Sequence, residues 1–397
     1  MKLLYVSWRT PYNSVSHAGG KTFNYYIKGM AKQTKNSIVL LTLGNEKDRE
    51  RCDCSEFGIE TIFINDYIDA CGWKNRISQK WIFGRSCGLY NQNVVRAVEK
   101  ALIDLQKKEN TPDAIVMEWT QMVLLIDIIK RVFPNAKYIA SEHDVSFLGL
   151  ERKYNAEKNI ICKLYRYMKY KVVYIRECKA LKKCDLILCH NKKDVKLLEN
   201  NNIYGAKSIV PYYDRYYLSG DVTKEPTYIT FFGAMAREEN YKSVIWFIEN
   251  VMPLISDLEF TFCVLGANPP ESLKKYASKK VLVTGFVENI TEYLNKTKVA
   301  VLPLVLGAGI KVKVLEFAAA GIPIVTNKIG IEGIPLERNS EYLHCETAEE
   351  FANTIREVLS NKIDLDAISK NEVIAIKKNF DLEASLKNYI SWLEDLV

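Results

Sequence analysis

Two segments of the chain open with the same pattern of apolar and polar positions. Residues 2–7 form a short apolar run that leads through a loop into a helical pattern over 21–32. Residues 228–233 form a second such run, followed by a polar loop and a helical pattern over 241–251. Continuous apolar runs indicate strands buried on both faces, as in parallel sheets. Each segment therefore predicts the first strand and helix of a dinucleotide-type α/β domain.

Further apolar runs alternate with helical patterns in both halves of the chain. This alternation predicts two parallel, doubly wound α/β domains, which bind ligands at the carboxyl ends of their strands. We expect one domain over 1–215, a second over 222–380, and a closing helix over 381–397, where apolar residues recur at helical spacing. The other expected strands are 37–43, 60–64, 113–118, 137–140, 185–189, 207–210, 260–265, 281–284, 299–302 and 322–326.

The composition excludes several classes of protein. With 397 residues, of which 48% are apolar, the chain is long enough for two domains with their own cores and is not a disordered protein. No apolar run approaches the roughly 20 residues that span a bilayer, and the amino terminus does not have the pattern of a secretory signal. The ten cysteines are scattered, without the paired motifs of a zinc site. We therefore expect reduced thiols in a cytoplasmic protein, with no metal and no other cofactor.

The formal charge of +7 is concentrated in one segment. Residues 151–184 hold eleven Lys or Arg and three Glu, a local charge of +8, and the rest of the chain sums to −1. Tyrosines and aliphatic residues are interleaved with these bases, a composition typical of proteins that bind anionic lipid surfaces. A helical hairpin with a solvated basic face would have the same composition. Both interpretations stay open, the first as contact with an anionic membrane surface through 152–183. No nucleic-acid-binding motif accompanies the segment, so we expect no nucleic acid partner.

The clearest candidate site is a glycine-rich turn between an expected strand and a helix. Gly307 and Gly309 allow the backbone to approach a ligand closely, and the helix that follows would present free N–H groups to an anion. Lys311 and Lys313 add positive charge there. Glu316 lies about one and a half turns into this helix, where a carboxylate can bind vicinal hydroxyls such as those of a ribose. The segment predicts a nucleotide site, although an ordinary turn between a strand and a helix would also contain such glycines.

A second candidate is His143, which follows the expected strand over 137–140. An imidazole at the carboxyl end of a strand can hydrogen-bond a ligand, and Glu142 or Asp144 would fix its orientation. The alternative is a loop histidine beside turn-forming acids. Of the other three histidines, His17 lies near the glycine loop and is a weaker site candidate. We interpret His190 as a structural residue and His344 as a residue without a site role.

These motifs occur in an order that resembles a known family. The segment around Glu316 is similar to the nucleotide-sugar-binding signature of the group 1, or family 4, glycosyltransferases of the GT-B fold. Gly19-Gly20 resembles the amino-terminal glycine loop of that family, and Glu177 with 184–190 and Asp194 resembles a stretch of its first domain. The order and spacing of these matches are specific and extend over most of the chain. The further matching positions are 210–214, 232–233, Asn240, 246–247, Pro253, 284–287 and 379–380.

The resemblance implies two Rossmann-like domains facing across a cleft, and a retaining, metal-independent glycosyltransferase that uses a nucleotide diphosphate-sugar. By this resemblance Glu316 would bind the ribose and Lys311 the diphosphate, with Arg237 as a second diphosphate ligand. Negative charge grows on the leaving diphosphate, so cations that stabilise it there are catalytic. His143 would contact the donor sugar, which makes these four the expected catalytic residues. The expected donor-binding positions are Gly19, Gly20, Gly233, Asn240, Gly307, Ala308, Gly309, Ile310, Lys311 and Glu316.

One position departs from the family pattern. The usual signature has two glutamates separated by seven residues, and Ala308 stands at the first. The way in which the donor sugar is held therefore stays open. We expect transfer to a glycan or lipid-linked acceptor in surface polysaccharide or glycoconjugate synthesis, in the cytoplasm or at the inner face of the membrane. Two alternatives remain: an inverting transferase or nucleotide-sugar epimerase with His143 or Glu142 as base, and a non-catalytic nucleotide-sugar-binding subunit.

Overall fold

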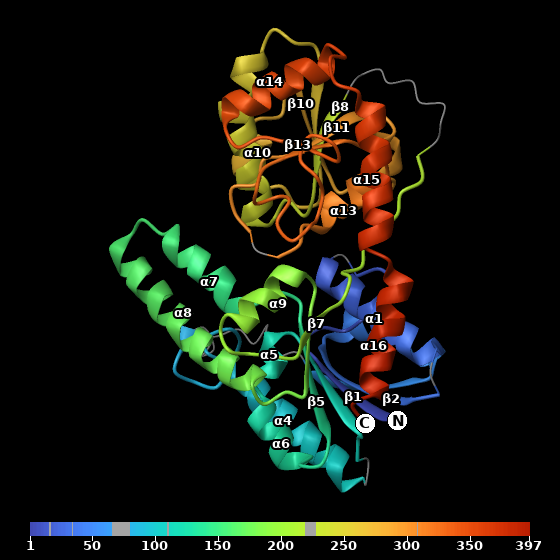
Figure 1. Cartoon of the computed structure of the whole chain (residues 1–397). Coiled ribbons are helices and arrows are strands. Elements are labelled where there is room, and N and C mark those ends of the chain that lie inside the picture. The colour runs from blue at the N-terminus through green and yellow to red at the C-terminus, as the bar shows by residue number, and fades with distance from the viewer. Residues whose placement is uncertain (16, 34, 66–79, 109–110, 219–227, 308) are drawn as a thin grey trace. The chain divides into compact units, whose positions relative to one another are not determined.

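The computed structural model describes residues 1–397 except 16, 34, 66–79, 109–110, 219–227 and 308 (Figure 1). The chain divides into two compact units, residues 1–212 with 382–397 and residues 213–381. Each unit contains one sheet in which every strand pair is parallel, with helices packed on the sheet. The prediction of two parallel, doubly wound α/β domains is therefore confirmed.

The first unit contains a seven-stranded sheet with the order β3-β2-β1-β4-β5-β6-β7. The strand order runs outward from β1 in both directions, so the chain changes direction across the sheet between β1 and β4. This reversal is the topological switch point of a doubly wound domain. The strands are β1 (Lys2–Ser7), β2 (Ser37–Gly44), β3 (Ile59–Asn65), β4 (Ala114–Glu118), β5 (Lys137–Glu142), β6 (Leu186–Cys189) and β7 (Ala206–Ser208).

Alternating residues of β1 enter two different hydrophobic cores, one on each face of the sheet. Leu4 and Val6 pack in one core with helices α4, α6 and α8, whereas Leu3 and Tyr5 pack in the other with α1 and α16. The strands are therefore buried on both faces, as their continuous apolar pattern predicts. The helices of this unit are α1 (Ala18–Gln33), α2 (Glu46–Arg51), η1 (Cys54–Phe57), α4 (Gln92–Lys107), α5 (Thr120–Val123), α6 (Ile126–Val132), α7 (Ser146–Asn155), α8 (Ile160–Leu181), α9 (Lys192–Glu199) and α16 (Leu382–Glu394).

The last helix of the chain, α16, packs on the first unit although it follows the second in sequence. The hydroxyls of Tyr26 and Ser385 lie 2.6 Å apart, and those of Tyr5 and Tyr389 lie 3.3 Å apart. Leu386 and Leu393 join the core that covers β1 and α1. Buried hydroxyl pairs of this kind fix the helix in one register, because an unpaired buried hydroxyl is costly.

Helices α7 and α8 form an antiparallel hairpin at one side of the first unit (Figure 1). The side chain of Asn159 begins α8 by accepting hydrogen bonds from the amides of Ile161 and Cys162, each at 3.0 Å. Glu177, buried in α8, begins α7 by accepting from the amides of Ser146 and Phe147 at 2.8 and 3.0 Å. The buried Glu177 therefore ties the base of the hairpin together.

The second unit repeats the topology with six strands in the order β10-β9-β8-β11-β12-β13. Its strands are β8 (Tyr228–Phe232), β9 (Thr261–Leu265), β10 (Val281–Gly285), β11 (Thr297–Leu302), β12 (Ile324–Thr326) and β13 (Leu343–His344). Its helices are α10 (Glu238–Asn250), η2 (Met252–Ile255), α11 (Glu271–Lys274), α12 (Thr291–Leu294), α13 (Val312–Ala319), α14 (Ala348–Leu359) and α15 (Leu365–Asn379). The switch point here lies between β8 and β11.

Two further observations bear on the expectations from composition. The nine described cysteines are free thiols. None of the described helices is at once long enough and apolar enough to cross a membrane.

Candidate active site

The predicted site residues follow the strands on either side of the two switch points. In the first unit β1 and β4 end at Ser7 and Glu118, and in the second β8 and β11 end at Phe232 and Leu302. Ligands of doubly wound domains bind outside the carboxyl ends of the strands at such points. Both candidate sites therefore lie where the fold favours a ligand.

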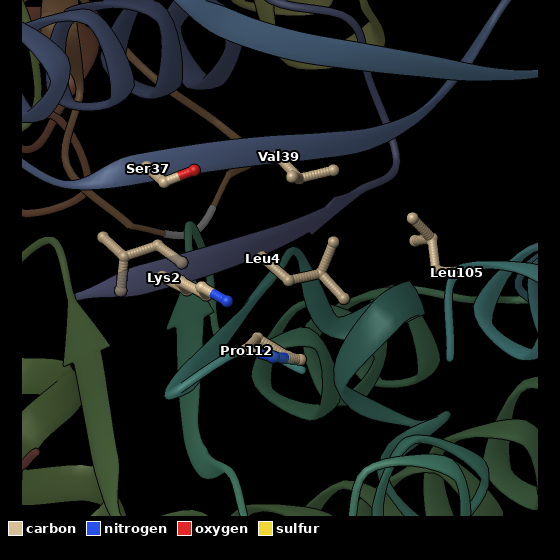
Figure 2. A pocket seen from close by; sticks show the side chains of 7 residues that line it. Lys2, Leu4, Ser37, Val39, Leu105 and Pro112 are labelled. Atoms are coloured by element: carbon tan, nitrogen blue, oxygen red, sulfur yellow. The ribbon is translucent and has the colours of Figure 1, made fainter. Parts of the chain in front are cut away.

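A small cavity of the first unit lies at the opposite edge of the sheet. Figure 2 shows it between the amino ends of β1 and β2, lined among others by Lys2, Ser37 and Pro112. Its volume is about 10 Å³, which is room for a single water molecule. This cavity is too small for a nucleotide or a sugar and is not the candidate site.

In the first unit, three aromatic rings gather at the carboxyl ends of three neighbouring strands. His143 follows β5 and stacks on the indole of Trp119, which follows β4, with ring centroids 4.2 Å apart and an interplanar angle of 13°. His190 follows β6 and meets His143 edge-on at 4.5 Å. Both histidines are buried. We call Glu118, Trp119, His143 and His190 the histidine cluster.

The amino end of α1 closes against this cluster. A Cβ added at Gly19 would lie 3.1 Å from Nδ1 of His143 and 3.4 Å from Nε1 of Trp119, so the helix packs against both rings only because residue 19 is glycine. The amide of Gly20 donates to Nδ1 of His17 at 2.9 Å, which satisfies an amide at the helix start. The structure thus brings Gly19, Gly20 and His143, predicted from separate motifs, to one place.

Glu118 orients the imidazole of His143. Its Oε2 lies 2.9 Å from Nε2 of His143, and both side chains are buried. We expected Glu142 or Asp144 in this role, and for Glu142 the expectation is wrong. Strand β5 extends through Glu142, whose carboxylate accepts a hydrogen bond from the Thr120 hydroxyl instead.

Burial removes the charge from the pair of Glu118 and His143. It raises the pKa of Glu118 to about 8, and it lowers the pKa of His143 to about 3. At neutral pH the Glu118 carboxyl group is therefore protonated and donates to Nε2, and the remaining proton of the neutral imidazole is on Nδ1. Nδ1 has no hydrogen-bond partner among the described residues. The arrangement presents a neutral hydrogen-bond donor rather than a base.

In the second unit, the loop after β8 is compressed against the loop after β9. A Cβ at Gly266 would lie 1.8 Å from the carbonyl oxygen of Gly233, and Gly266 has a φ of +149°. Only glycine allows this approach. A Cβ at Gly233 would lie 2.8 Å from Nζ of Lys313 and 2.9 Å from Nδ2 of Asn240. The glycine therefore leaves room for two polar side chains at the end of β8.

Lys313 is the centre of this polar group. Its Nζ donates to Oδ1 of Asn240 at 2.6 Å and lies 4.4 Å from the centroid of the Phe231 ring. Burial, and to a smaller extent the charge of Arg237, lowers the pKa of Lys313 to about 7. Close to neutral pH the ammonium group can therefore gain or lose its proton, and a bound anion would favour the charged form.

Lys311 holds the glycine turn that precedes α13. Its Nζ donates to the carbonyl oxygen of Gly309 at 2.6 Å and lies 3.8 Å from Oε2 of Glu332. A Cβ at Gly307 would lie 3.0 Å from Cε of Lys311, so the turn folds closely over the lysine stem. Lys311 is also the residue that begins α13, and Ile310 before it is half-buried. Ala308 lies outside the described residues.

Glu316 and Arg237 complete the group but differ in burial. Glu316 is buried in α13, and its Oε1 accepts a hydrogen bond from the amide of Asp214 at 3.3 Å. Arg237 begins α10, forms an ion pair with Glu239, and its side chain is 63% exposed. The charges of Arg237, Lys311 and Glu316 all act on the pKa of Lys313, so the four groups lie close together. We call Asn240, Lys311, Lys313, Glu316 and Arg237 the lysine cluster.

A comparison with known families decides what this second unit is. Residues 226–361 match the sequence model of the family described as glycosyl transferases group 1. This unit is a group 1 glycosyltransferase domain. The resemblance inferred from the motifs is therefore confirmed for this domain. No curated protein matches the chain in sequence.

Solved structures of low sequence identity have the same fold as the complete chain. Sucrose-phosphate synthase from Thermosynechococcus elongatus has a TM-score of 0.73 and 12% identity, over 100% of this chain and 98% of that one. HepE from Anabaena, in complex with UDP, has a TM-score of 0.70 and 11% identity, over 100% of both chains. The pneumococcal O-GlcNAc transferase GtfA, in complex with UDP and GlcNAc, has a TM-score of 0.67 and 12% identity, over 100% and 99%. The predicted GT-B fold is confirmed.

Some residues of the two clusters were not among the expected site residues. Glu118 is the last residue of β4 and Trp119 follows it, and their only signal in the sequence was a charged residue at the end of an apolar strand. The sequence indicated Lys313 only as added positive charge. Its contact with Asn240 was not expected. A spacing argument would have found Lys313, because residues 313 and 316 lie on the same side of a helix.

No metal site is evident within the described ranges, where no group of three or more His, Cys, Asp or Glu side chains is placed to hold an ion. The absence of a metal requirement stays a prediction for this glycosyltransferase.

Proposed function

We propose that the protein transfers a sugar from a nucleotide diphosphate-sugar to a glycan or lipid-linked acceptor, with retention of the anomeric configuration. The observation that carries the proposal is the lysine cluster of the group 1 domain. It combines two ammonium groups with a buried carboxylate at the carboxyl ends of β8 and β11. The complexes of HepE with UDP and of GtfA with UDP and GlcNAc support a UDP-sugar as the first donor to test.

In this proposal each group of the lysine cluster binds a different part of the donor. Glu316 accepts hydrogen bonds from the ribose hydroxyls, as it does from the amide of Asp214 in the structure. Lys311 and Lys313 bind the diphosphate, with the exposed guanidinium of Arg237 at its edge. The cations stabilise charge that grows on the leaving phosphate, and an interaction that strengthens in the transition state lowers the barrier. They would make a metal ion unnecessary.

The reaction breaks the bond between the anomeric carbon and the phosphate oxygen and forms a bond from that carbon to the acceptor oxygen. For retention the acceptor attacks the face from which the diphosphate departs. The departing phosphate oxygen accepts the proton of the acceptor hydroxyl, so no protein base is required. The products are the glycoside and the nucleoside diphosphate.

The histidine cluster supports this route over an inverting one. An inverting transferase needs a protein base, and burial keeps His143 neutral and weakly basic, with a pKa of about 3. We assign His143 the role of hydrogen-bond donor, through Nδ1, to an oxygen of the sugar substrate. Glu118 is then a positioning residue that holds the imidazole in the required tautomer.

We further propose that the enzyme acts in surface polysaccharide or glycoconjugate synthesis, in the cytoplasm and peripherally at the inner face of the membrane. The basic segment 152–183 supports the membrane association, because bases near a bilayer surface attract anionic lipid headgroups.

The proposal is tested with a panel of nucleotides and nucleotide sugars. A ligand at 100 times its dissociation constant stabilises the folded state by about 2.7 kcal/mol, a readily measured thermal shift. The donor found in this way is then offered with glycan acceptors, with and without EDTA, and the anomeric configuration of the product is read by NMR. A product of inverted configuration would contradict retention. A protein that binds a donor but neither hydrolyses nor transfers it would support the non-catalytic subunit.

A further inference from the structure

The tip of the α7–α8 hairpin exposes large apolar side chains to solvent. The hairpin projects from the sheet of the first unit, and its tip is the turn into α8 (Figure 1, green). At the start of α8, Ile160 and Ile161 are 84% and 82% exposed, and Leu164 is 61% exposed. Met168, one turn further, is also exposed. Exposed isoleucine side chains are unfavourable in water. This apolar tip therefore indicates a surface that binds an apolar partner.

The neighbouring segment adds two aromatic side chains beside α8. The hydroxyl of Tyr165 donates to the carbonyl oxygen of Lys80 at 3.1 Å, and the guanidinium of Arg176 donates to the carbonyl oxygen of Phe83 at 2.9 Å. These bonds hold the segment along the helix. Trp81 and Phe83 are both more than half exposed, and their rings pack edge to face. Exposed tryptophan next to bases is typical of residues at a membrane–water interface.

The bases of the segment 152–183 divide into two groups. Several serve the fold: Lys169 donates to the carbonyl oxygen of Gly88 at 2.7 Å, Arg176 binds the segment beside α8, and Lys183 pairs with Asp127. Others are exposed: Lys153 lies on α7, Lys158 lies on the turn, and Lys171, Lys179 and Lys182 lie further along α8 and at its end. Lys153 and Lys158 therefore place exposed positive charge next to the apolar tip, and further exposed lysines continue it along the helix.

Negative charge is scarce at the tip. Glu157, at the turn, accepts hydrogen bonds from the amides of Lys158 and Asn159 and pairs with Arg166 at 3.0 Å. An apolar point with exposed lysines beside it is complementary to a bilayer with anionic headgroups. It differs from the core of a protein interface, from which lysine is depleted.

We propose that the hairpin tip docks the enzyme on an anionic lipid bilayer, with Ile160, Ile161 and Leu164 inserted among the acyl chains and the surrounding lysines on the headgroup phosphates. This inference rests on the membrane association proposed above and locates it at the tip. Amphipathic elements of this kind enter a bilayer by about 5–10 Å, which one exposed helical turn can reach. Acceptors embedded in the bilayer are then brought to the first unit.

The test is sedimentation of the full chain with vesicles of pure phosphatidylcholine and of phosphatidylcholine with phosphatidylglycerol. We expect the protein to bind the anionic vesicles. The triple variant Ile160→Ser, Ile161→Ser, Leu164→Ser should bind them at least about tenfold more weakly, because each inserted side chain contributes to partitioning. Ile374→Ser, at an exposed isoleucine of α15 in the second unit, is the matched control and should bind as the parent does.

Charge reversal separates the electrostatic contribution. Lys153→Glu, Lys158→Glu and Lys171→Glu together should weaken binding to anionic vesicles by roughly fivefold per residue at low salt, with a smaller effect at high salt. Reversal of three exposed lysines of the second unit, Lys279, Lys362 and Lys378, is the control and should change little.

Three outcomes would overturn the proposal: a parent protein that binds neither vesicle, a serine variant that binds like the parent, or a parent that sediments without vesicles as a dimer that the serine variant converts to monomer. The last would assign the tip to a second copy of the chain. The catalytic proposal is tested separately, since tip variants should keep full transfer to a soluble acceptor. Loss of transfer in every protein would refute the catalytic proposal and leave the vesicle result intact.

Discussion

The histidine cluster and the lysine cluster occupy the same topological place in the two units but differ in charge. Each follows the carboxyl ends of strands at a switch point of a parallel sheet. In the first unit Glu118 and His143 are enclosed, and burial moves both pKa values toward the neutral forms. In the second unit Arg237 is largely exposed, and Lys313 has a pKa of about 7. One fold therefore provides a neutral hydrogen-bonding site in one unit and a site with three cationic side chains in the other, and the residue types at the strand ends make the difference.

The largest expected effect is that of Glu316→Ala in the lysine cluster. Loss of the carboxylate that binds the ribose should lower kcat/KM about 100-fold or more, since hydrogen bonds to buried charged groups are among the strongest. Steady-state kinetics with the donor identified by thermal shift measures it, and circular dichroism checks the fold.

Glu372→Gln is the matched control for Glu316→Ala. Glu372 is a second buried glutamate of the same unit, on α15, and accepts a hydrogen bond from the amide of Ile324 at 3.0 Å. Its substitution should leave kcat/KM within about threefold, because it lies away from the cluster. Normal transfer by the Glu316→Ala variant would show that the lysine cluster is not the donor site.

Substitution of Lys313 tests whether the second site is cationic. The lowered pKa of about 7 means that Lys313 is charged below pH 7 and becomes neutral above it. Affinity for UDP should therefore fall as the pH rises from 6 to 8, by about tenfold in the parent relative to Lys313→Met. Isothermal titration calorimetry at several pH values measures this, and the comparison cancels the titration of UDP itself.

Lys313→Arg keeps a positive charge over the whole range and should bind UDP with the pH dependence of the ligand alone. If the parent, Lys313→Met and Lys313→Arg have parallel profiles, Lys313 does not bind the diphosphate.

The apolar pattern was sufficient to predict the fold, because strands buried on both faces contain few polar residues and form continuous apolar runs. It failed where polar residues are buried. Strand β5 continues through Ser141 and Glu142, which the pattern placed in a loop. The Thr120 hydroxyl donates to one carboxyl oxygen of the buried Glu142. The glycine motifs and His143 were predictable from short sequences. Their partner Glu118 was not, because it lies 25 residues earlier in the chain and only the pairing of β4 with β5 brings it to His143.

Glu118→Gln should separate a neutral first site from a charged one. A glutamine amide can donate to Nε2 as the protonated carboxyl group does, so kcat should stay within about threefold at pH 7, whereas Glu118→Ala should lower it about tenfold. Above pH 8 the parent Glu118 ionises and accepts from Nε2–H, which moves the imidazole proton away from Nδ1. The parent kcat should therefore fall above pH 8, and that of Glu118→Gln should stay level.

Stability provides a second measurement of the same pair. Because the folded state raises the pKa of Glu118 from 4.5 to about 8, the folded protein binds the extra proton between these values and loses stability as the pH rises through them. At pH 8, Glu118→Gln should unfold with a free energy roughly 4 kcal/mol above that of the parent, and at pH 4.5 the two should nearly agree. An equal difference at both pH values would mean that Glu118 is ionised in the folded protein.

The smallest expected effects come from two glycines in helices of the first unit. A Cβ at Gly149, in α7, meets no atom within 4 Å, whereas one at Gly19, in α1, would lie 3.1 Å from Nδ1 of His143. Gly149→Ala should raise the free energy of unfolding by about 0.5–1 kcal/mol, the usual gain of alanine over glycine inside a helix. Gly19→Ala should forfeit that gain by pressing on the imidazole, and should lower kcat/KM several-fold while Gly149→Ala leaves it unchanged. Chemical denaturation with kinetics on the same samples measures both. Equal stabilisation with full activity in both variants would mean that the first site has spare room beside His143, and its enclosure would then not be what keeps it neutral.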